Sequence, residues 1–395
     1  MHVTQEGPDV LSRYCPVQAS GSGGTATPFR AGRASMDSRQ EWSGHRIVGG
    51  VDTHKDLHVA AVVDELDRVL ASQCFATTRH GYKQMLAWMR AFGSLQRVGI
   101  EATGTYGAGL MRYMQKAGVE VLEVTAPDKH DRRKRGKNDD LDAQNAAHAA
   151  FAGKRTVTPK SRDGMIESLR VLKACRKTAV AARRVALQMI QNTIVCAPDE
   201  LRETLRKMTR MQLIRTLAAW RPDQADYRNV ASAYRITLKS LGRRYLELND
   251  EIADLDTMII AIVDELAPAL VARNAIGHES AAQLLLTVGD NPERLQSEAS
   301  FAALCGVSPV PASSGKTTRH RLSRGGDRAA NSALHIIAIG RLRTDPRTQA
   351  YVAKRIAEGH SKLEAIRCLK RYIAREVFAL IKRSPMASRP TPMTA

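Results

Sequence analysis

The chain has 395 residues, enough for two or three domains, and 43% of them are hydrophobic, enough to form buried cores. Its 60 lysines and arginines outnumber its 40 aspartates and glutamates, giving a net charge of +20, and a basic chain of this size most often serves nucleic acid. No apolar run reaches the length of a membrane span, and the N-terminus lacks a hydrophobic signal core. The six scattered cysteines show no zinc or disulfide spacing. We therefore expect a cytoplasmic protein with reduced thiols.

The chain opens with a polar segment, residues 1–44, that we expect to be a disordered tail, with Met36 as a second possible start. From His45 to residue 160 the pattern changes to short apolar runs and amphipathic segments. It predicts three strands in a meander, followed by helix, strand, helix, strand and helix, at residues 47–51, 57–63, 68–75, 81–92, 98–100, 108–117, 119–124 and 139–152. This order is typical of an α/β ribonuclease H-like domain.

Acidic residues occupy particular points of this predicted domain. Asp52 closes the first strand and Glu101 closes the fourth, and in such a sheet these two strand ends can lie side by side. If Asn138 caps the last helix, Asp139 and Asp142 share one face. Carboxylates packed this closely repel one another unless a cation lies between them, so the set predicts a metal site.

Each acid also has an ordinary explanation. Asp52 suits a turn, Glu101 suits a helix entry, and acids in a first helical turn complement the helix dipole without binding anything. Each explanation taken alone describes the commoner situation. The coincidence of all the acids at the right points of one fold favours the metal site. A basic run just before the last helix suits a phosphate backbone and supplies five predicted nucleic-acid contacts: Arg132, Arg133, Lys134, Arg135 and Lys137.

Residues 161–270 read as a helical linker. Between Tyr234 and Leu266 the apolar residues recur at alternating spacings of four and three for more than four heptads, which predicts a coiled-coil seam. The seam could pair within the chain against a helix over 168–192. We favour the other interpretation, a spacer that assembles a dimer or tetramer.

The C-terminal domain, residues 271–384, is predicted to be mainly helical, with helices over 329–343 and 361–383, followed by a tail over 385–395. Residues 275–290 resemble a helix-hairpin-helix, although Asn274-Ala275 replaces the usual Pro-Gly, and a plain helical turn is an equal alternative. Ser314, with Ser313 beside it, lies in a Ser-Ser-Gly loop suited to holding or attacking a phosphodiester, or forms an ordinary solvated turn. Nearby cations are predicted to bind phosphates: Lys316, Arg319, Arg321 and Arg324.

Three segments in this order, Gly50–Asp56, Glu101–Gly107 and Lys137–Ala143, resemble the DEDD transposases of the IS one-ten insertion-sequence family, also called the one-sixteen or nine-oh-two type. The resemblance runs from about residue 46 to 383. It implies a RuvC-like N-terminal domain, a helical linker, and a C-terminal domain that carries an essential serine.

Carried over by motif, the resemblance makes Asp52, Glu101, Asp139 and Asp142 the ligands of Mg²⁺ or Mn²⁺, with Asp140 at a variable position. It makes Ser314 the nucleophile and implies that its site completes the acidic one across subunits. Relatives of this kind act on DNA together with a non-coding guide RNA. We therefore expect a transposase or recombinase. The alternatives are a junction-resolving RuvC-like nuclease, which needs no serine loop, and an inactive nucleic-acid-binding remnant, which needs neither site.

Overall fold

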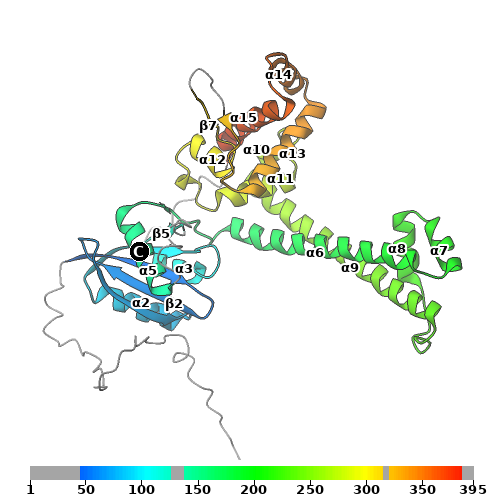
Figure 1. The fold of residues 1–395 in the computed structure, drawn as a ribbon, viewed down its shortest axis with the longest axis horizontal. Coiled ribbons are helices and arrows are strands. Elements are labelled where there is room, and N and C mark those ends of the chain that lie inside the picture. Colours follow the sequence, from blue (N-terminus) through cyan, green and yellow to red (C-terminus); the bar gives the residue numbers. More distant parts are fainter. Residues whose placement is uncertain (1–44, 126–137, 315–319, 385–395) are drawn as a thin grey trace, which may run out of the picture. The chain divides into compact units, whose positions relative to one another are not determined.

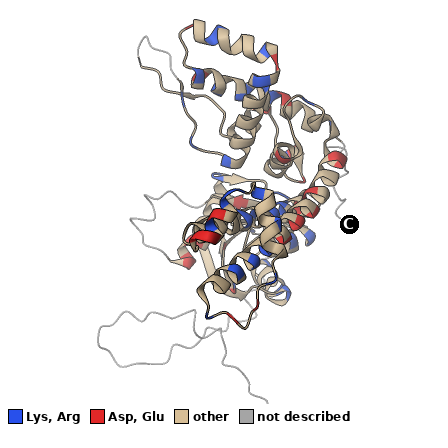
Figure 2. Cartoon of the chain, turned by 90° about the vertical axis from the view of Figure 1, so that its right-hand side faces the viewer, with Lys and Arg blue, Asp and Glu red and all other residues tan. Residues whose placement is uncertain are grey.

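The computed structural model describes residues 45–125, 138–314 and 320–384, which form two compact units (Figure 1). The first unit ends at Pro159 and the second begins at Lys160. The basic run at 132–137, Lys316, Arg319 and the two tails lie outside the described residues. Lysine and arginine residues are spread over the helices of both units, in keeping with the net charge of +20 (Figure 2).

The first unit is built on a six-stranded sheet with the strand order β3-β2-β1-β4-β5-β6. β1, β2 and β3 form the antiparallel meander, β4 and β5 continue the sheet in parallel, and β6 returns antiparallel. The strands are Arg46–Thr53, Leu57–Val63, Val69–Ala76, Ser94–Glu101, Glu120–Val124 and Thr156–Val157. This mixed α/β sheet is compatible with a ribonuclease H-like domain. The predicted strands are confirmed, β4 is longer than predicted, and β6 is a strand that the sequence pattern did not indicate.

The two faces of this sheet are covered by different helices. Side chains alternate along a strand, so odd-numbered residues of β1, such as Ile47 and Val51, pack with α2 (Arg79–Arg90) and α3 (Ala108–Lys116). Even-numbered residues face α5 (Asp139–Ala152), and Val48 packs there against Ala147. Asp52 shares the even register and therefore belongs to the α5 face.

Two glycines let α5 lie directly on the sheet. A Cβ atom on Gly50 would lie 2.1 Å from the backbone nitrogen of Ala147, and one on Gly99 would lie 2.5 Å from the carbonyl oxygen of Ala146. Any residue larger than glycine at these two positions is thus incompatible with the close approach of α5 to the sheet. The small alanine side chains on the buried face of α5 also permit this approach. Since Gly50 precedes Asp52 by two residues on the same face, this contact fixes the start of α5 near Asp52.

The second unit begins with a long helical hairpin formed by α6 (Met165–Val195) and α9 (Val230–Leu266), with α7 (Asp199–Arg206) and α8 (Arg210–Ala219) at its tip (Figure 1). Most of the predicted seam is buried, and Leu238, Leu241 and Tyr245 pack with residues of α6 and α8. Asn249 accepts a hydrogen bond of 2.6 Å from Nη1 of Arg183 on α6. The seam is therefore paired within the chain, as the intramolecular alternative requires, while the oligomer stays a prediction.

The remaining helices complete the second unit around a core that they share with the ends of α6 and α9. They are α10 (Pro268–Val271), α11 (His278–Val288), the short 3₁₀ helix η2 (Pro292–Arg294), α12 (Glu298–Leu304), α13 (Arg328–Thr344), α14 (Pro346–Ala357) and α15 (Lys362–Lys382). Between α12 and α13 the two-residue strands β7 (Val310–Pro311) and β8 (His320–Arg321) pair antiparallel. No helix of the described residues is long and apolar enough to span a membrane.

The segment at 275–290 that resembles a helix-hairpin-helix consists of a turn and α11, and the four-residue α10 precedes it. Ala275 in this turn has a φ of +62°, a left-handed conformation that glycine adopts more readily. This explains why glycine is usual at the position that Ala275 occupies. Phosphate binding by this turn stays a prediction.

Candidate metal centre and serine hairpin

The carboxyl ends of β1 and β4 lie side by side, as the sequence predicted. The two strands are parallel neighbours, with Val51 opposite Ile100 in register. The hydroxyl of Thr53 donates a hydrogen bond of 3.1 Å to the backbone carbonyl of Glu101, which ties the two strand ends together. Asp52 is buried, with 7% of its surface exposed, and Glu101 is partly buried.

The first turn of α5 is held in place by the predicted cap. The side-chain oxygen of Asn138 accepts a hydrogen bond of 3.1 Å from the backbone N–H of Asp140. The backbone carbonyl of Asn138 accepts another from the N–H of Asp142. This geometry separates the three acids of the turn. Asp142 is buried, the side chain of Asp139 is 49% exposed, and Asp140 is exposed.

His54 joins the strand end to the helix start. Its Nε2 lies 3.2 Å from Oδ2 of Asp52 and 3.4 Å from Oδ2 of Asp139. One potential ligand atom from each of these three residues lies within 4.8 Å of the other two, and they are the only such cluster in the residues that the structure describes. Two carboxylates and an imidazole are ligands that a divalent transition metal such as Mn²⁺ accepts, and the carboxylates also suit Mg²⁺.

The electrostatics of this cluster favour a bound cation. Burial raises the pKa of Asp52, His54 lowers it, and Asp142 and Asp139 raise it again. Asp142 is therefore close enough to repel Asp52, although only Asp139 approaches within ligand distance of the shared cluster. A cation between these carboxylates would relieve the repulsion. The residues fit a divalent metal on these grounds, and the place of the Glu101 and Asp142 carboxylates among its ligands stays a prediction.

His58 stabilises the backbone of His54 through a hydrogen bond. It is fully buried, its ring stacks on Tyr82 with centroids 5.8 Å apart, and its Nδ1 accepts a hydrogen bond of 3.3 Å from the N–H of His54. Burial lowers the pKa of His58 to about 4. It is therefore neutral near pH 7, and because Nδ1 accepts, its proton is on Nε2.

Ser314 lies in the second unit, at the end of the described part of the β7–β8 loop, and is exposed, as is Ser313. Arg321 in β8 and Arg324 in the following loop are exposed as well, while Lys316 and Arg319 lie outside the described residues. Asp327, which follows this loop, has a structural task of its own. Its carboxylate caps α13 by accepting from the N–H groups of Ala329 and Ala330, and it also accepts 2.8 Å from the hydroxyl of Thr287.

Two family models match the chain: the first covers most of the first unit and continues through α6, and the second lies within the second unit. A model of DEDD transposases matches residues 49–195, and a model described as the transposase IS116/IS110/IS902 family matches residues 269–353. The chain belongs to the IS110 family of transposases. The acidic cluster lies within the first match and Ser314 within the second.

Two curated relatives resemble this transposase. It is 27% identical over 150 residues to the insertion element IS110 uncharacterized 43.6 kDa protein of Streptomyces coelicolor, an alignment that spans 37% of each chain. It is 23% identical over 382 residues to the insertion element IS900 uncharacterized 42 kDa protein of Mycobacterium paratuberculosis, covering 85% of this chain and 96% of that one.

His54 is the residue of this IS110-family site that the sequence analysis missed. Its signal was its spacing, since a residue two positions after Asp52 on an extended chain returns to the same face of the sheet. The four predicted acids are distributed differently in the described structure. Asp52 and Asp139 come together with His54, Asp142 is near them, and Glu101 contributes its backbone carbonyl to the junction of β1 and β4.

Proposed function

We propose that this chain is a transposase that cuts and exchanges DNA strands with a divalent metal and a serine nucleophile. One observation carries the metal part: the ligand atoms of Asp52, His54 and Asp139 converge within 4.8 Å in a chain whose family is one of DEDD transposases. A divalent cation bound there would polarise the scissile phosphate and stabilise the charge on the leaving oxygen.

The protein's own residues have separate tasks at this centre. Asp52, Glu101, Asp139 and Asp142 are the proposed ligands, provided by two strand ends and one helix start. In the structure, Nε2 of His54 lies between the carboxylates of Asp52 and Asp139. With its proton released, this nitrogen would itself be a ligand of the cation. The backbone N–H of His54 donates a hydrogen bond to the buried His58. This bond fixes the backbone of His54 and thereby restricts the positions of its imidazole ring.

Ser314 is the proposed nucleophile of the strand-transfer step. Its Oγ forms a bond to phosphorus while one P–O ester bond of the strand breaks, the serine proton passes to a base, and the departing oxygen leaves as a hydroxyl after protonation. The cut strand stays attached as a phosphoserine ester until a strand hydroxyl attacks it and restores the serine. Exposure of Ser314 and the neighbouring Arg321 and Arg324 support this role.

The proposed partners are DNA and a non-coding guide RNA, and the proposed assembly is a dimer or tetramer in the cytoplasm. The net charge of +20 supports a nucleic-acid partner, and the family resemblance supports the RNA. Purifying the full chain with RNA from its own locus and sequencing what is retained tests the RNA. Recovery of only bulk cellular RNA would contradict it.

The serine role is tested by comparing Ser314→Ala with Ser313→Ala in strand exchange, with Mg²⁺ and the guide RNA present. A nucleophilic Ser314 predicts a loss on the order of 10³-fold or more for the first variant and a mild effect for its neighbour. Small and equal effects would leave a metal-dependent, junction-resolving nuclease, because such an enzyme needs the acidic centre alone.

A further inference from the structure

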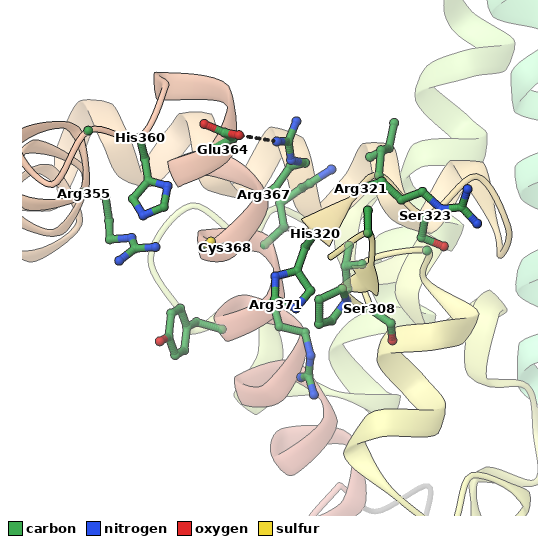
Figure 3. A pocket seen from close by; sticks show the side chains of 18 residues that line it. Ser308, His320, Arg321, Ser323, Arg355, His360, Glu364, Arg367, Cys368 and Arg371 are labelled. Carbon is green, nitrogen blue, oxygen red and sulfur yellow. Dashed lines mark ion pairs between the residues drawn. The ribbon is translucent and has the colours of Figure 1, made fainter. Parts of the chain in front are cut away.

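The second unit contains a cavity of about 890 Å³ beside the β7–β8 hairpin (Figure 3). Its wall is formed by residues 306–312 and 320–323, by the end of α14, and by the first half of α15. The volume lies within the range of roughly 300–1,000 Å³ that small-molecule pockets occupy. None of the lining residues belongs to the acidic centre, so this cavity needs its own explanation.

The lining of the cavity is strongly cationic. Arg367 and Arg371 extend from α15, His360 and Arg355 come from the segment before it, and His320 projects from β8 (Figure 3). Three of the lining arginines already have carboxylate partners: Arg355 with Glu358, Arg367 with Glu364, and Arg371 with Glu298. The paired arginines shape the wall, and the remaining cations decide what the cavity binds.

Lys370 is the exceptional member of this lining. Only 7% of its surface is exposed, and its Nζ donates a hydrogen bond of 2.7 Å to the side-chain oxygen of Asn331. Asn331 is fixed with that oxygen toward the lysine because its amide donates to the carbonyls of Cys305 and Gly306. Within the described residues no carboxylate pairs with Lys370, and burial followed by the charge of Arg367 lowers its pKa.

A buried ammonium group without an anion is costly, typically by several kcal/mol. It has three N–H donors, and the amide of Asn331 accounts for one. An anion in the cavity would supply both the missing charge and the missing acceptors. Arg321, which also lines the cavity and is exposed, has no ion pair within the described residues and is available to the same anion.

We propose that this cavity binds one nucleotide unit of a single nucleic-acid strand, with Lys370 and Arg321 on its phosphate. A nucleotide of a flexible strand can turn into a cavity and reach a buried amine, whereas the phosphates of a rigid duplex stay along its outer surface. Tyr372, His320 and His360 line the same cavity, and rings of this kind are those on which bases stack. The identity of the strand as a transposition substrate or guide rests on the proposed function, but binding requires neither the metal centre nor Ser314.

The test compares Lys370→Met with Lys382→Met. Both remove one lysine from α15, but Lys382 is exposed and lies about 18 Å along the helix, since each residue rises about 1.5 Å. Binding of labelled single-stranded DNA and RNA of about 12 nucleotides, and of a matching duplex, is measured by fluorescence anisotropy in EDTA. Lys370→Met is expected to weaken single-strand binding about tenfold and to reduce the salt dependence by about 0.7 in log–log slope. The duplex and the Lys382 variant should change less than about twofold.

Several outcomes would overturn the proposal. Wild-type affinity in Lys370→Met rules out the lysine contact, and an equal loss for duplex and single strand rules out a nucleotide-sized site. The preferred strand, DNA or RNA, names the source of the nucleotide. The melting temperature of Lys370→Met checks its folding, because the variant removes a buried charge but also leaves the side-chain oxygen of Asn331 without its donor.

A second measurement uses the unaltered chain. Cys368 lines the cavity, so a bound nucleotide should slow its reaction with a maleimide several-fold, as followed by peptide mapping. Equal modification rates with and without the single strand would contradict occupancy. Asp52→Asn and Ser314→Ala should both keep the protection. Failure of the cavity proposal therefore leaves the proposed catalysis untouched, and failure of catalysis leaves the cavity result standing.

Discussion

The acidic centre and the basic cavity are positioned by different kinds of structure. In the first unit, Asp52 and Asp139 meet because backbone packs on backbone: Gly50 lets α5 touch β1, and Asn138 fixes the first turn. In the second unit, the cavity cations extend from α14, α15 and β8, and three of the arginines are held by individual ion pairs. The comparison teaches that the candidate metal site depends on close backbone contact, while the cavity depends on long side chains, whose replacement we expect the fold to tolerate.

The largest expected effect comes from removing a metal ligand. Asp52→Asn should lower metal-dependent DNA cleavage on the order of 10³-fold or more, because the cluster of Asp52, His54 and Asp139 then loses one of its two carboxylates. Asp140→Asn is the matched control, since Asp140 is exposed in the same helical turn and its backbone alone serves the cap. Cleavage should then change little.

A second measurement on the same variants does not depend on catalysis. Mn²⁺ should raise the melting temperature of the wild type and of Asp140→Asn, because a ligand that binds the folded state stabilises it. It should not do so for Asp52→Asn. Without metal, Asp52→Asn should be at least as stable as the wild type at pH 7, since burial raises the pKa of Asp52 and so penalises its ionised form. Equal metal responses in all three proteins would contradict the site.

Replacing one glycine in each unit by alanine tests the comparison through the free energy of unfolding. Gly50→Ala should destabilise the chain by about 3 kcal/mol and impair cleavage, because its Cβ would lie 2.1–2.3 Å from backbone atoms of Ala147 and Ala143. Gly325→Ala, in the loop after β8, has no atom within 4 Å of the added Cβ, and its free energy of unfolding should stay within about 0.5 kcal/mol of the wild type. Denaturant unfolding measures both. A mild effect at Gly50 would mean that α5 can shift away from the sheet without loss.

The sequence was most informative where chemistry coincides with element ends. Asp52 and Glu101 follow apolar runs, and Asn138 precedes an acidic helical turn, so strand ends and cap were predictable. α14 was missed although Asp345-Pro346 marks its start, with Asp345 as N-cap and Pro346 at the first helical position. The cavity was not predictable, because its residues come from separate segments between 306 and 372 and only packing brings them together. The burial of Lys370 likewise depends on the packing of α15, and no local sequence pattern around the lysine indicates it.

The smallest expected effect concerns the pH dependence of the first unit. The pKa of His58 is lowered from about 6.5 to about 4 by burial, so the unfolded chain binds a proton between these pH values that the folded chain does not. The free energy of unfolding therefore falls as the pH drops through this window. For these two pKa values the loss between pH 7 and pH 5 is about 2 kcal/mol.

Thermal unfolding of the full chain in EDTA at pH 7 and pH 5 measures this loss for the wild type and for His58→Asn. Asparagine keeps an acceptor for the N–H of His54 but does not titrate, so the variant should lose the His58 contribution to the pH dependence. It should also be less stable at pH 7, because the stacking of the ring on Tyr82 is lost. An unchanged pH dependence in His58→Asn would show that other groups of the fold, and not this buried imidazole, control its acid sensitivity. The hydrogen bond between the N–H of His54 and His58 would then have no influence on the acid sensitivity of the fold. The contrast between the two units would rest on backbone packing alone.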